Sequence, residues 1–195
     1  MKICFSLTFL LFFFNCNSYV DNSFDSLSNS FELWYNKNHP VLGTSKNNKD
    51  YNDSFRLNDF KSNERYLLDL NRFYFELTQI DPEKLNKIND IQYDRIKKTI
   101  LKLIYFEEHI KHREWKPSVK LTELHNGIQY LLNYTYIPSN QRLKHIESRL
   151  NKVSQILDQT LINILFLSQK EYHNCLVKIQ SIINLLNAIP THEYY

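Results

Sequence analysis

The residues with the clearest capacity for chemistry stand near the middle of the chain, where His109 and His112 are three positions apart. At that spacing both imidazoles can face one side of a helix and ligate the same metal ion. A zinc site needs three or four converging ligands, and a hydrolytic one also needs a general base. The chain contains no H-E-x-x-H motif, and Lys111, Arg113 and Lys116 make the surroundings positive. We therefore interpret the two histidines as a solvated helix end and predict no metal ligand.

Glu107 and Glu108 form an adjacent acid pair in the same segment. Paired carboxylates perform acid–base catalysis when burial separates their pKa values. Consecutive helix positions point about 100° apart, so these two carboxylates do not face each other. The chain also contains no G-x-S-x-G nucleophile motif, no Walker loop and no Rossmann glycine pattern. The sequence therefore predicts a charged helix face here, with no catalytic residue and no cofactor-binding residue in the chain.

A small basic cluster, Lys97, Lys98 and Lys102, stands opposite the apolar positions of its own segment. Such a cluster could contact phosphate or lipid headgroups, but we favour a solvated helix face. The net charge of the chain is +3, which is too weak and too evenly spread to indicate nucleic-acid binding. We therefore predict no nucleic-acid partner.

The N-terminus has the features of an export signal over residues 1–16. Lys2 precedes an apolar run over residues 3–14, and twelve helical residues span about 18 Å, less than a ~30 Å hydrocarbon core. A signal-peptide core fits this length better than a membrane anchor does. Cys16 follows as in a bacterial lipoprotein signal and would become the lipidated first residue, although Asn15 replaces the usual small residue. Simple secretion with cleavage nearby and an uncleaved anchor are the alternatives. We expect an exported, periplasmic or outer-membrane-associated protein that is attached to the membrane through Cys16.

The number and positions of the cysteines are compatible with either lipidation or simple secretion. Cys4 lies inside the signal, and if Cys16 is lipidated, Cys175 is the only thiol left, so no disulfide within the chain can form. Cys175 stands in an apolar helical register, where a buried structural thiol is the default interpretation.

The pattern of apolar residues predicts an all-α fold. With only 2 Gly and 5 Pro in 195 residues, the chain has few of the turn residues that all-β domains need. We predict an antiparallel bundle of about six helices over residues 24–190, after a polar tether at 17–23. Asp81 and Ser139 are expected to cap helices, and residues 41–59 are expected to form a long polar surface connection. Apolar positions recur at steps of three and four in six segments: residues 24–35, 66–80, 93–110, 121–132, 143–165 and 176–186.

The order of these features resembles the N-terminal half of a bacterial family called domain of unknown function 885. Members of that family look like exported, helical, zinc-dependent peptidases. The similarity covers residues 31–188, and Ser154 departs from it because the family tends to have a proline nearby. The matching segments are Phe31-Glu-Leu-Trp-Tyr35, His39-Pro40-Val-Leu-Gly43-Thr44, Leu77-Thr-Gln-Ile80-Asp81, Trp115-Lys-Pro117, Gly127-Ile-Gln-Tyr-Leu-Leu132 and Arg142-Leu-Lys-His-Ile-Glu-Ser-Arg149-Leu150.

In that family the H-E-x-x-H motif and the third zinc ligand belong to the C-terminal half, which has no counterpart among these 195 residues. No catalytic residue of the family therefore has a matching position here. The resemblance implies a non-catalytic scaffold or substrate-groove wall. The zinc-binding half would be encoded separately, either because the gene is truncated or split or because this chain is a helical subunit.

Two other functions compete with that one. The first is a membrane-surface lipoprotein that acts as a protein-interaction module through an aromatic-rich face, such as Trp34, Tyr35, Phe73 and Tyr74. The second is a stand-alone hydrolase with an unrecognised site.

Overall fold

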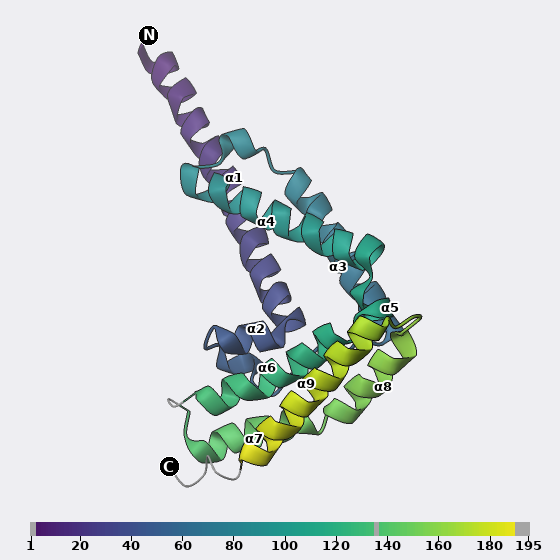
Figure 1. Cartoon of the computed structure of the whole chain (residues 1–195). Coiled ribbons are helices and arrows are strands. Elements are labelled where there is room, and N and C mark those ends of the chain that lie inside the picture. The colour runs from purple at the N-terminus through teal and green to yellow at the C-terminus, as the bar shows by residue number, and fades with distance from the viewer. Residues whose placement is uncertain (1–2, 135–136, 190–195) are drawn as a thin grey trace. The chain divides into compact units, whose positions relative to one another are not determined.

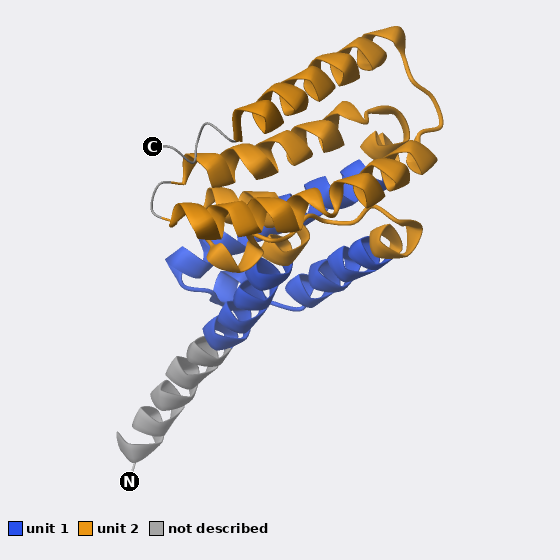
Figure 2. Ribbon diagram, turned by 90° about the horizontal axis from the view of Figure 1, so that it is seen from below, with its two compact units in different colours: residues 1–34, 65–108 blue, residues 35–64, 109–195 orange. Residues whose placement is uncertain are grey.

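The computed structural model describes the backbone of residues 3–134 and 137–189, and the side chains of residues 20–134 and 137–189 (Figure 1). The described residues form helices and no strand, which confirms the all-α prediction. No helix, over the part of the chain described, combines the length and hydropathy that a membrane crossing requires. The sequence predicted one domain over residues 24–190. The structure divides into two compact units, Met1–Trp34 with Arg65–Glu108 and Tyr35–Glu64 with His109–Tyr195, and the predicted domain bounds stay a prediction (Figure 2).

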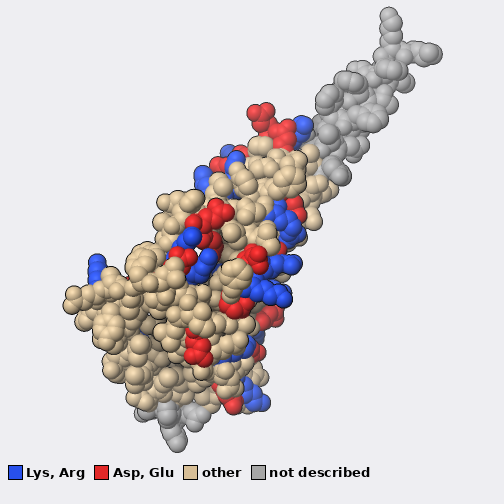
Figure 3. All heavy atoms as spheres, turned by 90° about the vertical axis from the view of Figure 1, so that its right-hand side faces the viewer, with Lys and Arg blue, Asp and Glu red and all other residues tan. Residues whose placement is uncertain are grey.

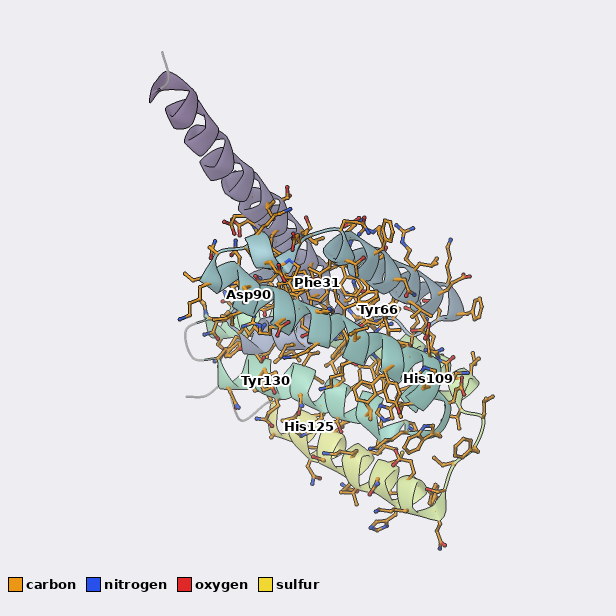
Figure 4. The ribbon with its side chains drawn as sticks, turned by 90° about the horizontal axis from the view of Figure 1, so that it is seen from above. Phe31, Tyr66, Asp90, His109, His125 and Tyr130 are labelled. Carbon is orange, nitrogen blue, oxygen red and sulfur yellow. The ribbon has the colours of Figure 1, made fainter. Side chains whose placement is uncertain are left out.

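Unit 1 contains most of α1 (Ile3–Asn38) and α3 (Phe60–Thr78), together with α4 (Lys87–Tyr105). Aromatic rings join α1 to α3: the centroids of Phe31 and Phe73 lie 5.4 Å apart edge to face, and those of Trp34 and Tyr66 lie 5.0 Å apart in a stack. Figure 4 labels Phe31 and Tyr66 on these two helices. The buried apolar residues of this unit are Phe24, Phe31, Tyr66, Leu70, Phe73, Leu77, Tyr93, Ile96 and Ile100.

The helix α1 runs without interruption through residues 17–23, where the sequence predicted a tether. Polar residues such as Asn and Ser reduce helix propensity only by a fraction of a kcal/mol each, so helical neighbours on both sides can maintain the helix. The segment is therefore helical, and its role as a tether stays a prediction. Cys16 and the predicted signal over residues 1–16 lie outside the described side chains, so cleavage and lipidation stay predictions.

The start of α4 differs from the prediction because the capping residue is Asn86. Its side chain accepts hydrogen bonds from the backbone N–H groups of Ile88 and Asn89, whereas Asp81 caps only the short 3-10 turn Pro82–Lys84. Asp21 of α1 accepts a hydrogen bond from the Asn86 backbone N–H at 3.1 Å and from the Asn89 side chain at 2.9 Å. The Asn86 bond is the largest cause of a lowered pKa at Asp21. These bonds join α1 to the N-terminus of α4.

Unit 2 is organised around α6 (Ser118–Asn133), which packs against α2 (Pro40–Ser45), α7 (Ser139–Leu150) and α9 (Gln169–Ala188). A short helix α5 (His112–Trp115) and the helix α8 (Val153–Asn163) complete it (Figure 1). The single helix predicted over residues 143–165 is divided into α7 and α8 by a turn at Asn151 and Lys152. Ser139 begins α7 but does not cap it, because Pro138 occupies the cap position.

The segment 41–59, predicted as a polar surface connection, belongs to the core of unit 2. Val41 and Phe55 are buried and cluster with Leu121 and Leu124 of α6 and Ile156 of α8. The segment also forms α2 and a 3-10 turn at Lys49–Tyr51. The prediction was wrong because it was based on the polar composition of the whole segment, whereas two of its apolar side chains, Val41 and Phe55, reach the core.

Candidate functional site

Unit 2 contains an open pocket of about 330 Å³ between α2 and α6, which we take as the candidate site. Pro40 starts α2 at a position where its missing N–H costs no hydrogen bond, and the short helix then places its side chains opposite α6. The α6 residues of the pocket recur at helical steps and so share one face. Figure 4 labels Tyr130 on this helix. The pocket is lined by His39, Val41, Leu42, Ser45, Val119, Thr122, Glu123, Asn126 and Tyr130.

His39 contributes a neutral imidazole to the pocket. Burial, together with the smaller effects of the positive charges of Arg56 and Lys120, lowers the pKa of His39 to about 4. The ring centroid lies 4.4 Å from that of Tyr35. At neutral pH this imidazole therefore offers one hydrogen-bond donor and one acceptor, and no charge.

Glu123, which lines the pocket from α6, forms an ion pair with the buried Lys120. Nζ of Lys120 donates to Oε2 of Glu123 at 2.8 Å and to the backbone oxygen of Arg56 at 2.9 Å. Burial lowers the pKa of Lys120, while the charge of Glu123 acts in the other direction. Because Lys120 binds one carboxylate oxygen of Glu123, that carboxylate is held in a fixed position beside the pocket, where it can accept hydrogen bonds.

A buried arginine supports α2 and α6 from the side of α7. The Arg149 guanidinium is fully buried and donates to the backbone oxygens of Gly127 and, at 3.0 Å, of Tyr51, and to Oγ1 of Thr44 at 2.6 Å. It also lies 5.1 Å from the Phe55 ring centroid. Burial lowers the pKa of Arg149 to about 10, so the group is still charged at neutral pH. Arg149 therefore has a structural role in fixing the segment that carries the pocket.

The candidate metal ligands do not come together. His109 lies in the π-helical turn Phe106–Ile110, and His112 begins α5. Lys111 between them has a left-handed backbone with φ of 48°, so the two histidines do not share the single helix face that their spacing predicted. Figure 4 shows His109 well separated from His125 of α6. No group of three or more His, Cys, Asp or Glu side chains in the described part of the chain could hold a metal ion.

Lys98 and Lys102 of the basic cluster and Glu108 of the acid pair are exposed, whereas Lys97 and Glu107 are half-buried. Nζ of Lys98 lies 3.4 Å from Oδ2 of Asp94, and both side chains are mostly exposed. Nζ of Lys97 lies 5.7 Å from the Tyr93 ring centroid.

Two residues of the aromatic face considered for partner binding, Trp34 and Phe73, pack within unit 1, whereas Tyr35 belongs to unit 2. Phe73 is buried, and Nε1 of Trp34 donates to Oδ2 of Asp69 at 3.0 Å while its ring stacks on Tyr66.

Cys175 is half-buried, and burial raises the pKa of its thiol, which agrees with the structural role predicted for it.

Sequence reasoning missed the pocket and the role of Arg149. The available signal was weak: a proline after His39 and apolar residues within a polar segment. Arg149 was noticed only as part of a family-like segment, because a charged residue in a helix is normally expected at the surface.

No family model matches the chain, and a search of curated proteins finds no match. Among solved structures, the chain is similar to a protein of Shewanella oneidensis described as a "putative lipoprotein of unknown function", with a TM-score of 0.68 and 15% sequence identity. The match covers 87% of this chain and 36% of that chain, so this chain spans little more than a third of that protein's length. The similarity shows a shared fold, and membership of the domain-of-unknown-function family 885 stays a prediction.

Proposed function

We propose that this chain is a non-catalytic helical region of a larger exported assembly, equivalent to the N-terminal part of the zinc peptidase-like proteins that it resembles. The main support is one observation: 87% of the chain matches a solved protein whose chain is covered only to 36%. A protein that contains this fold can thus have nearly two thirds of its length elsewhere. The catalytic groups would belong to that additional polypeptide.

The chemistry of the described residues is consistent with this assignment. A hydrolytic zinc ion needs three protein ligands and a base, and no such group is found over residues 20–134 and 137–189. The described side chains do not fit zinc, so we assign no reaction step to this chain. The pocket between α2 and α6 offers a neutral imidazole, a carboxylate held by Lys120 and several hydrogen-bonding groups. These groups can position a polar segment without reacting with it.

The same chain could instead act alone as an interaction module at a membrane surface. Cys16 after the apolar run supports this second candidate, as does the description of the Shewanella protein as a lipoprotein. The two candidates share export and lipid attachment. They differ in whether a catalytic polypeptide exists.

The test is to sequence the coding DNA downstream of the codon for Tyr195. We expect a reading frame, fused or separate, that contains H-E-x-x-H on a helical pattern. Its absence from the neighbouring DNA would reject the peptidase assembly and favour the interaction module. Mass spectrometry of the mature N-terminus tests the shared part, because lipidated Cys16 must be the first residue if the lipoprotein prediction is correct.

A further inference from the structure

The last described helix, α9, presents apolar side chains on two faces. One face packs on the rest of unit 2 through Cys175, Ile182 and Leu185. The second face is exposed and follows helical steps of four, three and four, which place its members within about 60° of the helix circumference. We call this second face the outer stripe: Tyr172, Leu176, Ile179 and Ile183, which are 54%, 47%, 43% and 44% exposed.

The end of α8 and the connection to α9 extend this apolar surface. Leu161, Ile162, Leu165 and Phe166 are each more than 60% exposed, and residues 159–169 contain no charged side chain. Figure 3 faces the side that carries α8 in Figure 1 and shows a broad area there without Lys, Arg, Asp or Glu. Solvated protein surfaces rarely keep so many large apolar side chains together unless they bind something.

The connection is held in place rather than loose. The backbone N–H of Leu165 donates to the backbone oxygen of Glu114 at 2.8 Å, and the Phe166 ring stacks on Trp115 with centroids 6.4 Å apart. At the other end, Oε1 of Glu171 accepts a hydrogen bond from the Ser118 backbone N–H at 2.9 Å. These contacts fix the exposed apolar side chains before any partner arrives, which reduces the entropy cost of binding.

We propose that the outer stripe, together with the α8–α9 connection, is the docking face for an apolar helix of the additional polypeptide. This inference rests on the proposed function. Steps of three and four are the spacing with which one helix packs along another. The length of the Shewanella protein is the reason for choosing this occupant, since nearly two thirds of that chain lies outside the match.

The charge pattern favours a protein over a membrane. Helices that lie on anionic membranes have Lys and Arg along their polar face. In α9 the charged residues are Lys170, Glu171 and Lys178, and Glu171 is buried. A partner helix with an uncharged apolar face matches this surface better than lipid headgroups do.

The test uses the mature full-length chain and the polypeptide encoded downstream of codon 195, mixed and studied by calorimetry. We expect Ile179→Lys combined with Ile183→Lys to raise the dissociation constant at least about 100-fold. The reason is that charges replace two apolar side chains at the centre of the interface. The matched control is Ile88→Lys with Ile91→Lys on α4, whose side chains are 71% and 62% exposed. The control should change the constant by less than about threefold.

A photo-crosslinking residue at Tyr172 provides a second readout that does not depend on the stability of a variant. We expect a crosslink to the downstream polypeptide. Binding that is unaffected by the α9 variant, or a crosslink only to a second copy of this chain, would overturn the docking face while leaving the proposed function intact. A downstream polypeptide that does not bind the unmodified chain would reject both.

Discussion

Replacing Arg149 with alanine should destabilise unit 2 by about 3 kcal/mol. The substitution leaves three acceptors without their donor: the buried backbone oxygen of Gly127, the buried Oγ1 of Thr44 and the partly buried backbone oxygen of Tyr51. A buried acceptor without a partner costs about 2 kcal/mol. An opposing effect comes from the charge of Arg149. Its pKa, lowered to about 10, corresponds to a destabilisation of the buried cation by about 3 kcal/mol, and removing the side chain recovers this free energy. The combined cost of the three unpaired acceptors and of the lost contact with the Phe55 ring exceeds the free energy recovered by removing the cation.

The assay is urea unfolding of the mature protein followed by far-ultraviolet circular dichroism. Arg142→Ala is the matched control on the same helix, because Nη1 of Arg142 makes one hydrogen bond, to the backbone oxygen of Leu132 at 3.0 Å. It should cost about 1 kcal/mol. Arg149→Lys should fall between the two, since a lysine cannot reach all three acceptors at once. Equal losses for Arg149→Ala and Arg142→Ala would refute the structural role of Arg149.

Three further predictions concern the same unit. Gly127→Ala should cost about 2 kcal/mol in urea unfolding, because a Cβ there would approach Cζ of Phe55 to 2.7 Å; an unchanged midpoint would contradict this packing. Between pH 6.5 and about 4 the unfolded chain binds a proton at His39 that the folded chain does not, so stability should fall by up to about 3 kcal/mol as the pH is lowered through this range. His39→Gln should remove that part of the pH dependence, and a pH profile identical to that of the unmodified chain would count against a buried neutral imidazole. Glu171→Gln weakens the acceptor for the Ser118 N–H and should cost about 1 kcal/mol, measured as accelerated hydrogen exchange at Ser118; unchanged exchange would show that the bond is dispensable.

Periodicity was sufficient to predict most helices, since apolar steps of three and four at residues 66–80 and 121–132 correspond closely to α3 and α6. It could not predict the turn at Asn151 and Lys152, because the apolar pattern continues across it while the backbone does not. Nor could it show that the chain forms two units, because the helices of unit 1 are separated in sequence by residues 35–64. Association between distant segments depends on contacts that a local pattern does not contain.

The candidate site shows the same limitation. His109 and His112 were prominent in the sequence and proved to be separated by a left-handed residue. His39 and Lys120 were inconspicuous, and only their burial gives them unusual pKa values. The polar segment 41–59 was assigned to the surface, yet Thr44 and Asn52 are buried there, and Arg149 bonds to Thr44. Burial of polar groups depends on partners far away in the sequence, which composition does not indicate.

The most direct test of the account measures zinc content and peptide hydrolysis with the mature chain alone and then with the polypeptide encoded downstream. We expect the chain alone to bind no stoichiometric zinc and to cleave no peptide, and we expect chelator-sensitive hydrolysis only when the second polypeptide is present. Stoichiometric zinc and chelator-sensitive cleavage by the isolated chain would contradict the account.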